Sequence, residues 1–377
     1  MKNILVLFGG ASVEHDISVI TAVQVCASLN DELYNVIPVY ISKFGTWFKM
    51  ERLLSVSDFN NCALKNKDIV YLDNGFLQYK SLLKKRKCKI DCVILSMHGG
   101  CGEDGSFAGY CKVNSIPFIN PGVEASSSGL NKIFFKTLLK GLNIPYVEYC
   151  ELRKDDNVFC EESYKQIINI LGENIIIKPN RLGSSIGVSV VDDYSSYVSG
   201  IELGFKFDSN LLVEKRLIDF NEYNIAIYKN IDGLVVSDIE QPLNQNAILT
   251  FEDKYIGDIK TKGSMESLKK IFPADICGEL KEQIIYYAKL CYEKMFMKGV
   301  VRFDFLFDNI NKKLYLNEVN TIPGSFANYL FRRKKISFSK ILDEMIDYAA
   351  YEFDIENKLI KSFESCVLDS GGKCVKK

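Results

Sequence analysis

Residues 300–324 read VVRFDFLFDNINKKLYLNEVNTIPG, two largely apolar runs joined by a polar turn. The composition of the two runs predicts a pair of neighbouring strands. Because residues i and i+2 share one face of a strand, Arg302 is expected to lie beside Asp304. Glu318 and Asn320 are related in the same way on the second strand. All four side chains are therefore predicted to face one cleft.

The side chains in this cleft indicate metal and phosphate chemistry. Mg²⁺ prefers carboxylate and amide oxygens together with phosphate oxygens, so Asp304, Glu318 and Asn320 suit a two-ion site on a nucleotide triphosphate. Arg302 would then stabilise an oxyanion, which suits a guanidinium in a dry site. The alternative is an exposed carboxylate pair with Arg302 as its salt-bridge partner, but that alternative gives the asparagine and the Pro-Gly turn no folding role.

A second signal lies upstream, where a glycine and serine loop (residues 183–187) follows the apolar run Ile175 to Lys178. A lysine at the end of a buried strand is costly unless its ammonium reaches water or an anion, and phosphate is the natural anion. The backbone N–H groups and hydroxyls of the loop can approach phosphates closely because glycine lacks a Cβ. Such a loop alone would be weak evidence, since many hairpins carry Gly-Ser. Next to Lys178 it predicts a phosphate-covering loop.

The whole chain indicates an α/β protein of several lobes, since 377 residues exceed a single core. The apolar run Ile4 to Phe8, a glycine turn and a helix from near Ser18 begin a parallel α/β lobe, with helix-like segments between its later strands. We expect an N-terminal domain at 1–121, a central subdomain at 122–215, a C-terminal subdomain at 216–350 with a lid loop at about 244–272, and a tail at 351–377.

Composition excludes several classes of partner. With 47 basic and 48 acidic residues the net charge is -1, so no global field draws the chain to nucleic acid or to an anionic membrane. No apolar stretch approaches the roughly 18 residues of a membrane-spanning helix. The 12 cysteines lack zinc spacing and are expected to be reduced thiols in the cytoplasm. The basic run Lys84 to Lys89 is interpreted as a solvated helix end. The run Arg332 to Lys335 is interpreted as a solvated face, the alternative being a cation that attracts a substrate carboxylate.

Five motifs are spread along the chain. They are Gly9-Gly10-x-Ser12-x-Glu14-His15-x-Ile17-Ser18, His98-Gly99 with Gly102-Glu103-Asp104-Gly105, Lys178-Pro179 with Gly183-Ser184-Ser185-Ile186-Gly187, Phe251-Glu252-Asp253-Lys254-Tyr255, and Glu318-Val319-Asn320-Thr321-Ile322-Pro323-Gly324. In this order, over about residues 1–350, they closely resemble the D-alanine:D-alanine ligases. The resemblance implies an α/β ATP-grasp fold of three lobes, with ATP held between the central and C-terminal lobes.

The resemblance also implies a role for each matching residue. The catalytic group would be Glu14, which holds the ammonium of the first D-amino acid, its hydrogen-bonded companions Ser184 and Tyr255, and the oxyanion-stabilising Arg302. ATP would be bound by Lys132, Lys178, Ser185 and Lys254 at the phosphates and by Glu214, Lys215, Leu217 and Glu222 at the adenine and ribose. The magnesium ligands would be Asp304, Glu318 and Asn320. The substrate side would be completed by His98, Gly324, Tyr329 and Leu330.

The implied reaction makes D-alanyl-D-alanine for peptidoglycan precursors. The carboxylate of the first D-alanine attacks the γ-phosphate of ATP, and the amine of the second substrate then captures the acyl phosphate. The implied cofactors are ATP and two Mg²⁺ ions, with Mn²⁺ as a substitute. A homodimer is usual for the family.

The second substrate is the open point of this resemblance. Many family members place a serine five residues beyond the Pro-Gly glycine, where this chain has Tyr329. D-Alanine is expected as the second substrate, and D-serine, as in the vancomycin-resistance ligases, is the alternative. D-Lactate ligases carry histidine at the place of Tyr255, which argues against a hydroxy acid. A second hypothesis is a different ATP-grasp carboxylate-amine ligase, and a third is a nucleotide-binding regulator without turnover.

Overall fold

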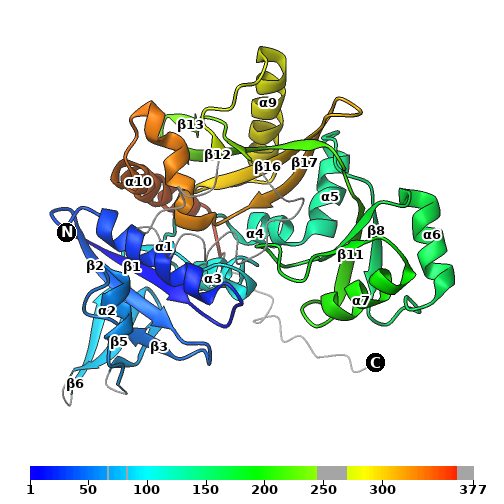
Figure 1. Cartoon of the computed structure of the whole chain (residues 1–377). Coiled ribbons are helices and arrows are strands. Elements are labelled where there is room, and N and C mark those ends of the chain that lie inside the picture. The colour runs from blue at the N-terminus through cyan, green and yellow to red at the C-terminus, as the bar shows by residue number, and fades with distance from the viewer. Residues whose placement is uncertain (66–67, 82–83, 244–269, 363–377) are drawn as a thin grey trace, which may run out of the picture.

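The computed structural model describes residues 1–65, 68–81, 84–243 and 270–362. Within these ranges the chain forms three α/β lobes, each with a four-stranded sheet, and two smaller antiparallel sheets. Figure 1 shows the N-terminal lobe in blue and cyan, the central lobe mainly in green and the C-terminal lobe in colours from yellow-green to orange. The predicted lid lies almost wholly outside the described residues, and Lys254 and Tyr255 lie outside them too.

The N-terminal lobe is organised by the apolar strand β1 (Lys2–Gly9). It pairs in parallel with β2 (Tyr34–Ile41) and β7 (Cys92–Leu95), and β3 (Trp47–Lys49) pairs antiparallel to β2. The expected parallel α/β lobe is therefore confirmed. Its helices are α1 (His15–Ser28), α2 (Val56–Asn60) and α3 (Ser106–Val113), with the 3-10 turn η2 (Gly100–Gly102).

The first helix begins at His15, so the predicted start near Ser18 was wrong by about one turn. The Ser18 hydroxyl is buried inside the lobe rather than placed as a helix cap. It accepts a hydrogen bond from the Gly9 N–H at 2.7 Å and donates one to the Ser96 carbonyl at 2.7 Å. Ser18 therefore ties α1 to the ends of β1 and β7, and its polarity has a tertiary cause.

A small antiparallel sheet replaces the helix-like segments expected between the later strands. It consists of β4 (Val70–Asp73), β5 (Phe76–Ser81) and β6 (Lys84–Lys89). The basic run is thus an edge strand, and its interpretation as a helix end was wrong. Lysines suit an exposed edge because they discourage pairing with another chain. Their stems also cover apolar surface, as where the Lys87 ammonium lies 4.7 Å from the centre of the Phe76 ring.

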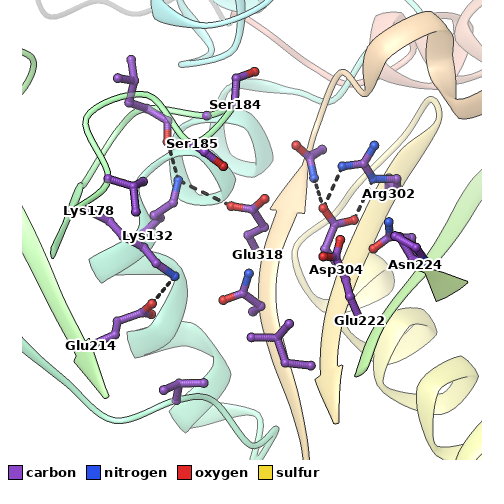
Figure 2. A pocket seen from close by; sticks show the side chains of 18 of the residues that line it. Lys132, Lys178, Ser184, Ser185, Glu214, Glu222, Asn224, Arg302, Asp304 and Glu318 are labelled. Atoms are coloured by element: carbon purple, nitrogen blue, oxygen red, sulfur yellow. Dashed lines mark hydrogen bonds and ion pairs between the residues drawn. The ribbon is translucent and has the colours of Figure 1, made fainter. Parts of the chain in front are cut away.

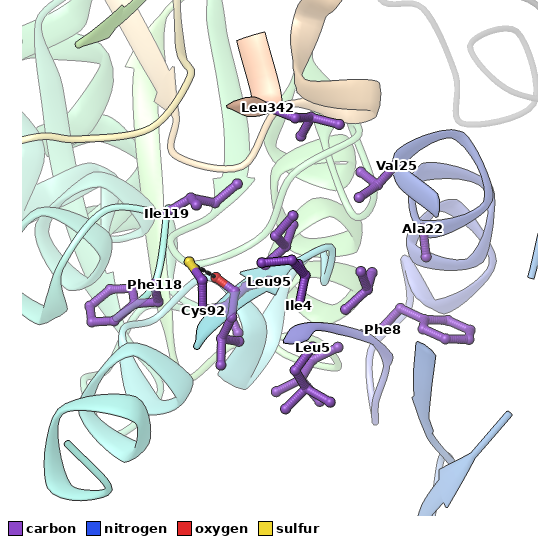
Figure 3. Packing of buried hydrophobic residues seen from close by; sticks show 14 of the residues in the cluster. Ile4, Leu5, Phe8, Ala22, Val25, Cys92, Leu95, Phe118, Ile119 and Leu342 are labelled. Atoms are coloured by element: carbon purple, nitrogen blue, oxygen red, sulfur yellow. Dashed lines mark hydrogen bonds between the residues drawn. The ribbon is translucent and has the colours of Figure 1, made fainter. Parts of the chain in front are cut away.

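The core of the N-terminal lobe reaches into the C-terminal end of the chain. Figure 3 shows Ile4 and Leu5 of β1 in one packed cluster with Val25 of α1 and with Leu342. Leu342 belongs to the last helix, α10 (Phe338–Asn357), and is fully buried. Because one apolar cluster joins elements from both ends of the sequence, the N-terminal and C-terminal lobes are held against each other.

The central lobe is an antiparallel sheet covered by two helices. The strand order is β10-β9-β11-β8, and the helices α6 and α7 pack their apolar residues against it. The strands on either side of the glycine and serine loop, β9 and β10, pair directly. The elements are α4 (Val123–Leu130), α5 (Lys132–Gly141), β8 (Tyr149–Arg153), α6 (Glu161–Leu171), β9 (Ile175–Pro179), β10 (Ser189–Val191), α7 (Tyr194–Gly204) and β11 (Asn210–Lys215).

The C-terminal lobe contains the strand pair predicted from residues 300–324. Its sheet has the order β13-β12-β16-β17. Arg302 of β16 pairs with Asn320 of β17, and Asp304 pairs with Glu318, so the predicted convergence of these side chains is confirmed. The elements are β12 (Phe220–Asn230), β13 (Gly233–Val236), β14 (Gln241–Pro242), β15 (Lys270–Ile271), α9 (Gly278–Lys294), β16 (Val301–Asp308), β17 (Lys313–Asn320) and the 3-10 segment η3 (Gly324–Lys334).

Two expectations about the chain as a whole concern its helices and its thiols. Over the described ranges, no helix combines the length and the apolarity needed to cross a bilayer. The ten cysteines in these ranges are all free thiols. The expected cytoplasmic localisation stays a prediction.

Candidate active site

A pocket of about 310 Å³ is lined by residues from all three lobes. In Figure 2 the glycine and serine loop lies above it, Lys178 and Glu214 lie on one side, and Arg302 and Asp304 lie on the other. Most of the predicted site residues line this pocket: Glu14, His98, Lys132, Lys178, Ser184, Ser185, Glu214, Lys215, Leu217, Glu222, Arg302, Asp304, Glu318, Asn320, Gly324 and Tyr329.

Two buried side chains, Glu214 and Lys136, and the half-buried Lys178 form the side of the pocket that belongs to the central lobe. The Glu214 carboxylate accepts hydrogen bonds from Lys178 and, at 2.7 Å, from Lys136. Burial alone would raise the pKa of Glu214, but the ammonium groups of Lys136 and Lys178 outweigh it and lower the pKa to about 2. Burial alone would likewise lower the pKa of Lys178, and Glu214 raises it instead. Lys178 and the Glu214 carboxylate thus favour each other's charged form, whereas burial lowers the pKa of Lys136 despite the neighbouring carboxylate.

Lys136 was not singled out in the sequence, although a signal for it exists. It lies four residues after Lys132 on α5, so both side chains occupy the same face of that helix. Lys136 is only 1% exposed, and its ammonium also lies 5.6 Å from the centre of the Tyr146 ring. Lys136 therefore lies one helical turn from Lys132, the candidate for phosphate binding, and its ion pair holds the Glu214 carboxylate in place.

Lys132 reaches across the pocket from the first turn of α5. Its ammonium donates to the Leu182 carbonyl at 2.7 Å and lies 3.7 Å from Glu318 on the opposite wall (Figure 2). One cation thus contacts both the glycine and serine loop and the acidic strand β17. A phosphate placed between these elements would meet Lys132 and Lys178 together.

The glycine and serine loop meets the N-terminal lobe at Glu14. The Ser184 hydroxyl donates a hydrogen bond to the Glu14 carboxylate, which is 7% exposed. Gly99 makes room for this carboxylate, since a Cβ there would lie 2.9 Å from a Glu14 oxygen and 2.6 Å from the Ser12 hydroxyl. The φ of Gly99, +66°, also favours glycine. The predicted pairing of Glu14 with Ser184 is present, while Tyr255 lies outside the described residues.

The opposite wall is acidic and carries the half-buried Arg302. Arg302 donates two hydrogen bonds of 2.7 Å to the Asp304 carboxylate, and Asn320 donates a third of 2.9 Å. No group of three or more Asp, Glu, His or Cys side chains in the described ranges is arranged to hold a metal ion. Asp304, Glu318 and the Asn320 amide oxygen are nevertheless hard ligands that fit Mg²⁺ shared with phosphates, because Mg²⁺ is usually bound through few protein ligands.

His98 lies at the back of the pocket and is connected to both ends of the chain. Its Nε2 lies 2.8 Å from the Thr21 hydroxyl, which accepts a hydrogen bond from the Ser325 N–H of η3 at 3.2 Å. Burial lowers the pKa of His98 to about 4, so the imidazole is neutral near pH 7. Glu103 lies 4.0 Å from it, and burial together with the Glu14 charge raises the pKa of Glu103 to about 8. A neutral His98 fits the expected structural or substrate-edge role.

The part of the pocket next to η3 contains two residues that the sequence did not single out, Glu240 and Lys270, and lacks Leu330. The Tyr329 hydroxyl donates a 2.5 Å hydrogen bond to Glu240, and the Lys270 ammonium lies 3.5 Å from the other oxygen of Glu240. Neither Glu240 nor Lys270 belongs to a motif noted in the sequence. Leu330 is fully buried in the apolar cluster shared by the N-terminal and C-terminal lobes, so it packs behind Tyr329 and does not line the pocket.

Two models of known protein families match this chain. A model described as D-ala D-ala ligase N-terminus matches residues 3–121, and one described as D-ala D-ala ligase C-terminus matches residues 138–347. The chain belongs to the D-alanine–D-alanine ligase family. The α/β ATP-grasp fold expected from the sequence is thereby confirmed, and the chain is an ATP-dependent ligase.

Relatives within the D-alanine–D-alanine ligase family match nearly the whole chain. The D-alanine–D-alanine ligase of Thermosipho melanesiensis is 39% identical over 375 residues, 98% of each chain. That of Campylobacter jejuni subsp. jejuni serotype O:6 is 34% identical over 340 residues, 90% of this chain and 92% of the other.

Solved structures of the family superpose over a similar extent. The D-alanine–D-alanine ligase of Helicobacter pylori has a TM-score of 0.73 at 27% identity and covers 92% of this chain and 98% of its own. The VanG D-Ala:D-Ser ligase of Enterococcus faecalis has a TM-score of 0.75 at 26% identity, with 92% and 99% covered.

Proposed function

We propose that this ligase joins two molecules of D-alanine to D-alanyl-D-alanine, at the expense of ATP, for peptidoglycan precursors. Membership of the family over almost the whole chain supports this function. The observation that carries it is the convergence, in one pocket, of lysines suited to phosphate, the oxygen ligands on β16 and β17, and the Glu14–Ser184 pair.

The nucleotide is proposed to lie between the central and C-terminal lobes. Lys132, Lys178 and Ser185 would bind its phosphates, together with Lys254 of the undescribed segment. The adenine and ribose would contact Glu214, Lys215, Leu217 and Glu222. Asp304, Glu318 and Asn320 are proposed to hold two Mg²⁺ ions, for which Mn²⁺ would substitute. When bound, these ions would supply positive charge beside the transferred phosphoryl group.

The first amino acid is proposed to bind at Glu14, whose carboxylate would pair with its ammonium group. Ser184 holds that carboxylate from the central lobe, so a bound substrate would contact two lobes at once. Arg302 is proposed to leave its ion pair with Asp304 in part and to stabilise the oxyanion that forms when the second amine attacks. Tyr255 and Gly324 are proposed to complete this site.

The organisation of the molecule is also a proposal. We propose domain boundaries at 121/122, 215/216 and 350/351, a homodimer, and a cytoplasmic location. The family's use of small-molecule substrates and the balanced charge of the chain support a protein that binds neither nucleic acid nor membrane.

The test is a panel of D- and L-amino acids with ATP and Mg²⁺, in which product mass and released phosphate are both measured. Phosphate release should depend on D-alanine, and the dominant product should have the mass of D-alanyl-D-alanine. ADP formed equally without any amino acid would contradict a ligase. A dominant mixed product in competition between D-alanine and D-serine would instead favour a D-alanine:D-serine ligase.

A further inference from the structure

Glu240 is a buried carboxylate whose contacts lie at the end of the pocket next to η3. It is 3% exposed and immediately precedes β14. Its backbone is fixed by two hydrogen bonds with Asn224, of 2.9 and 3.0 Å. Its side chain accepts from the Tyr329 hydroxyl at 2.5 Å and lies 3.5 Å from the Lys270 ammonium. The three side chains of Glu240, Tyr329 and Lys270 all line the pocket, and we call them the acceptor group.

The direction of the hydrogen bond in this group decides what Tyr329 can offer a ligand. The Tyr329 hydroxyl donates to the Glu240 carboxylate, so the phenolic proton lies toward Glu240. Burial and the charge of Glu240 raise the pKa of Tyr329 well above its ordinary value, so the phenol keeps this proton. The oxygen of Tyr329 then presents lone pairs to the pocket. It can accept a hydrogen bond from a substrate, but it has no proton left to donate to a substrate carboxylate.

Lys270 keeps this arrangement stable. Its ammonium lies 4.2 Å from the centre of the Tyr329 ring as well as near Glu240, and it therefore packs against both partners. Lys270 therefore contacts both the Glu240 carboxylate and the Tyr329 ring at this end of the pocket. The acceptor group thus presents an oxygen, backed by a carboxylate, to whatever occupies the space beside Arg302.

We propose that Tyr329, oriented by Glu240, accepts a hydrogen bond from the amino group of the second substrate, which makes this end of the pocket specific for amine-bearing acceptors. This inference rests on the ligase function proposed above. Tyr329 would contact the substrate, whereas Glu240 is a positioning residue that acts through the phenol. A hydroxy acid such as D-lactate brings a neutral hydroxyl to the same oxygen and gains less from the carboxylate behind it.

The chain offers a matched control for this pair. Tyr228 on β12 donates a 2.6 Å hydrogen bond to Glu344 on α10, so it forms the same phenol-carboxylate contact outside the pocket. Tyr228→Phe removes the same atom as Tyr329→Phe from a buried tyrosine. Its effect measures what the loss of such a bond does to the fold alone.

The experiment is steady-state kinetics with Mg²⁺ and ATP, in which the two D-alanine sites are resolved by their separate KM values. Tyr329→Phe should raise the KM of the second D-alanine about tenfold or more, because a hydrogen bond to a charged group is lost. The KM values of ATP and of the first D-alanine should stay near those of the parent. Glu240→Gln should raise the same second KM, and should add little in the Tyr329→Phe background if it acts through the phenol.

A second readout is the ratio of D-alanine to D-lactate incorporated in competition, which Glu240→Gln should lower. Because this ratio is measured in Glu240→Gln, it still tests the inference if Tyr329→Phe does not fold. An unchanged second KM in folded Tyr329→Phe, additive effects of the two variants, an equal shift in Tyr228→Phe, or an unchanged ratio in Glu240→Gln would each overturn the inference. Absence of dipeptide from the parent protein would instead overturn the ligase function on which it rests.

Discussion

The two ends of the pocket are built from different kinds of contact. At the end proposed for the nucleotide, which we call the nucleotide end, Glu214 lies between the amino groups of Lys136 and Lys178 and forms an ion pair with each. At the acceptor end Glu240 faces a neutral phenol, that of Tyr329, in its closest contact. An ion pair can exchange one partner for an incoming phosphate, whereas a phenol-carboxylate bond fixes the direction of one proton. The first end is suited to neutralising charge and the second to selecting a hydrogen-bonding group.

This difference has energetic consequences that experiments can separate. Removing one partner from a buried charge cluster leaves an uncompensated charge, which is strongly destabilising. Removing a phenol hydroxyl costs one hydrogen bond and little packing. Variants at the nucleotide end should therefore affect turnover and stability strongly, and variants at the acceptor end should affect mainly the choice of substrate.

The largest effect is expected at the acidic wall. Glu318→Gln removes a carboxylate that contacts Lys132 and that we propose as a metal ligand. The turnover number should fall on the order of a thousandfold, because the charge that organises the phosphates is lost. Dipeptide formation under saturating substrates measures it, with Glu293→Gln on the exposed side of α9 as the control. A folded Glu318→Gln protein that works at the parent's rate would rule out this role.

The next effect concerns the stability of the nucleotide end. Lys136→Met keeps the length of the side chain but leaves Glu214 with Lys178 as its remaining ammonium partner. The free energy of unfolding should fall by about 3 kcal/mol. Denaturant unfolding measures it, and Lys140→Met, one turn further along α5 and exposed, is the matched control. Equal losses in the two variants would mean that burial of the charge at position 136 has no special cost.

The nucleotide end was predictable because its signals are local in the sequence. Arg302 and Asp304 are two residues apart on a strand, and Glu318 and Asn320 repeat that spacing, so side-chain alternation alone placed them together. Even Lys136 has a local signal, its distance of one helical turn from Lys132. What the sequence could not show is burial, which depends on how β11 and α5 pack.

The acceptor end was not predictable because its contacts are long-range. Tyr329 and Glu240 are 89 residues apart, and no alternation or spacing rule relates them. The resemblance to the family pointed to Tyr329, but only the position of Glu240 shows where its proton goes. The basic strand β6 and the early start of α1 were likewise decided by tertiary contacts.

Between the two ends, Glu103 gives a pH-dependent prediction. Its pKa is raised from 4.5 to about 8 in the folded chain by burial and by Glu14, so its contribution to stability is full below pH 4.5 and is lost as the pH rises toward 8. His98 has the opposite sign, since burial lowers its pKa from 6.5 to about 4 and its contribution is lost only as the pH falls from 6.5 toward 4. Of these two groups, only Glu103 changes its protonation between pH 6.5 and 8.

In that window the free energy of unfolding should decrease with a slope approaching ~1.4 kcal/mol per pH unit for one proton. Glu103→Gln should flatten this part of the profile, because glutamine has no proton to lose. Denaturant titrations at several pH values without nucleotide measure the slope. A steep decrease that persists in Glu103→Gln would assign it to another group.

The smallest effect is expected from Tyr228→Phe. This variant separates the effect of losing a phenol-carboxylate hydrogen bond from the effect of where that bond lies in the molecule. Glu344 keeps a hydrogen bond from Asn230 at 3.1 Å and lies 3.7 Å from Lys340, so it is not left without partners when the phenol hydroxyl is removed. The free energy of unfolding should therefore fall by only about 1 kcal/mol. Both KM values for D-alanine should be unchanged, since Tyr228 lies outside the pocket. Because the same pair of side chains then affects stability at one place and acceptor binding at the other, the difference must come from what the oxygen of Tyr329 faces.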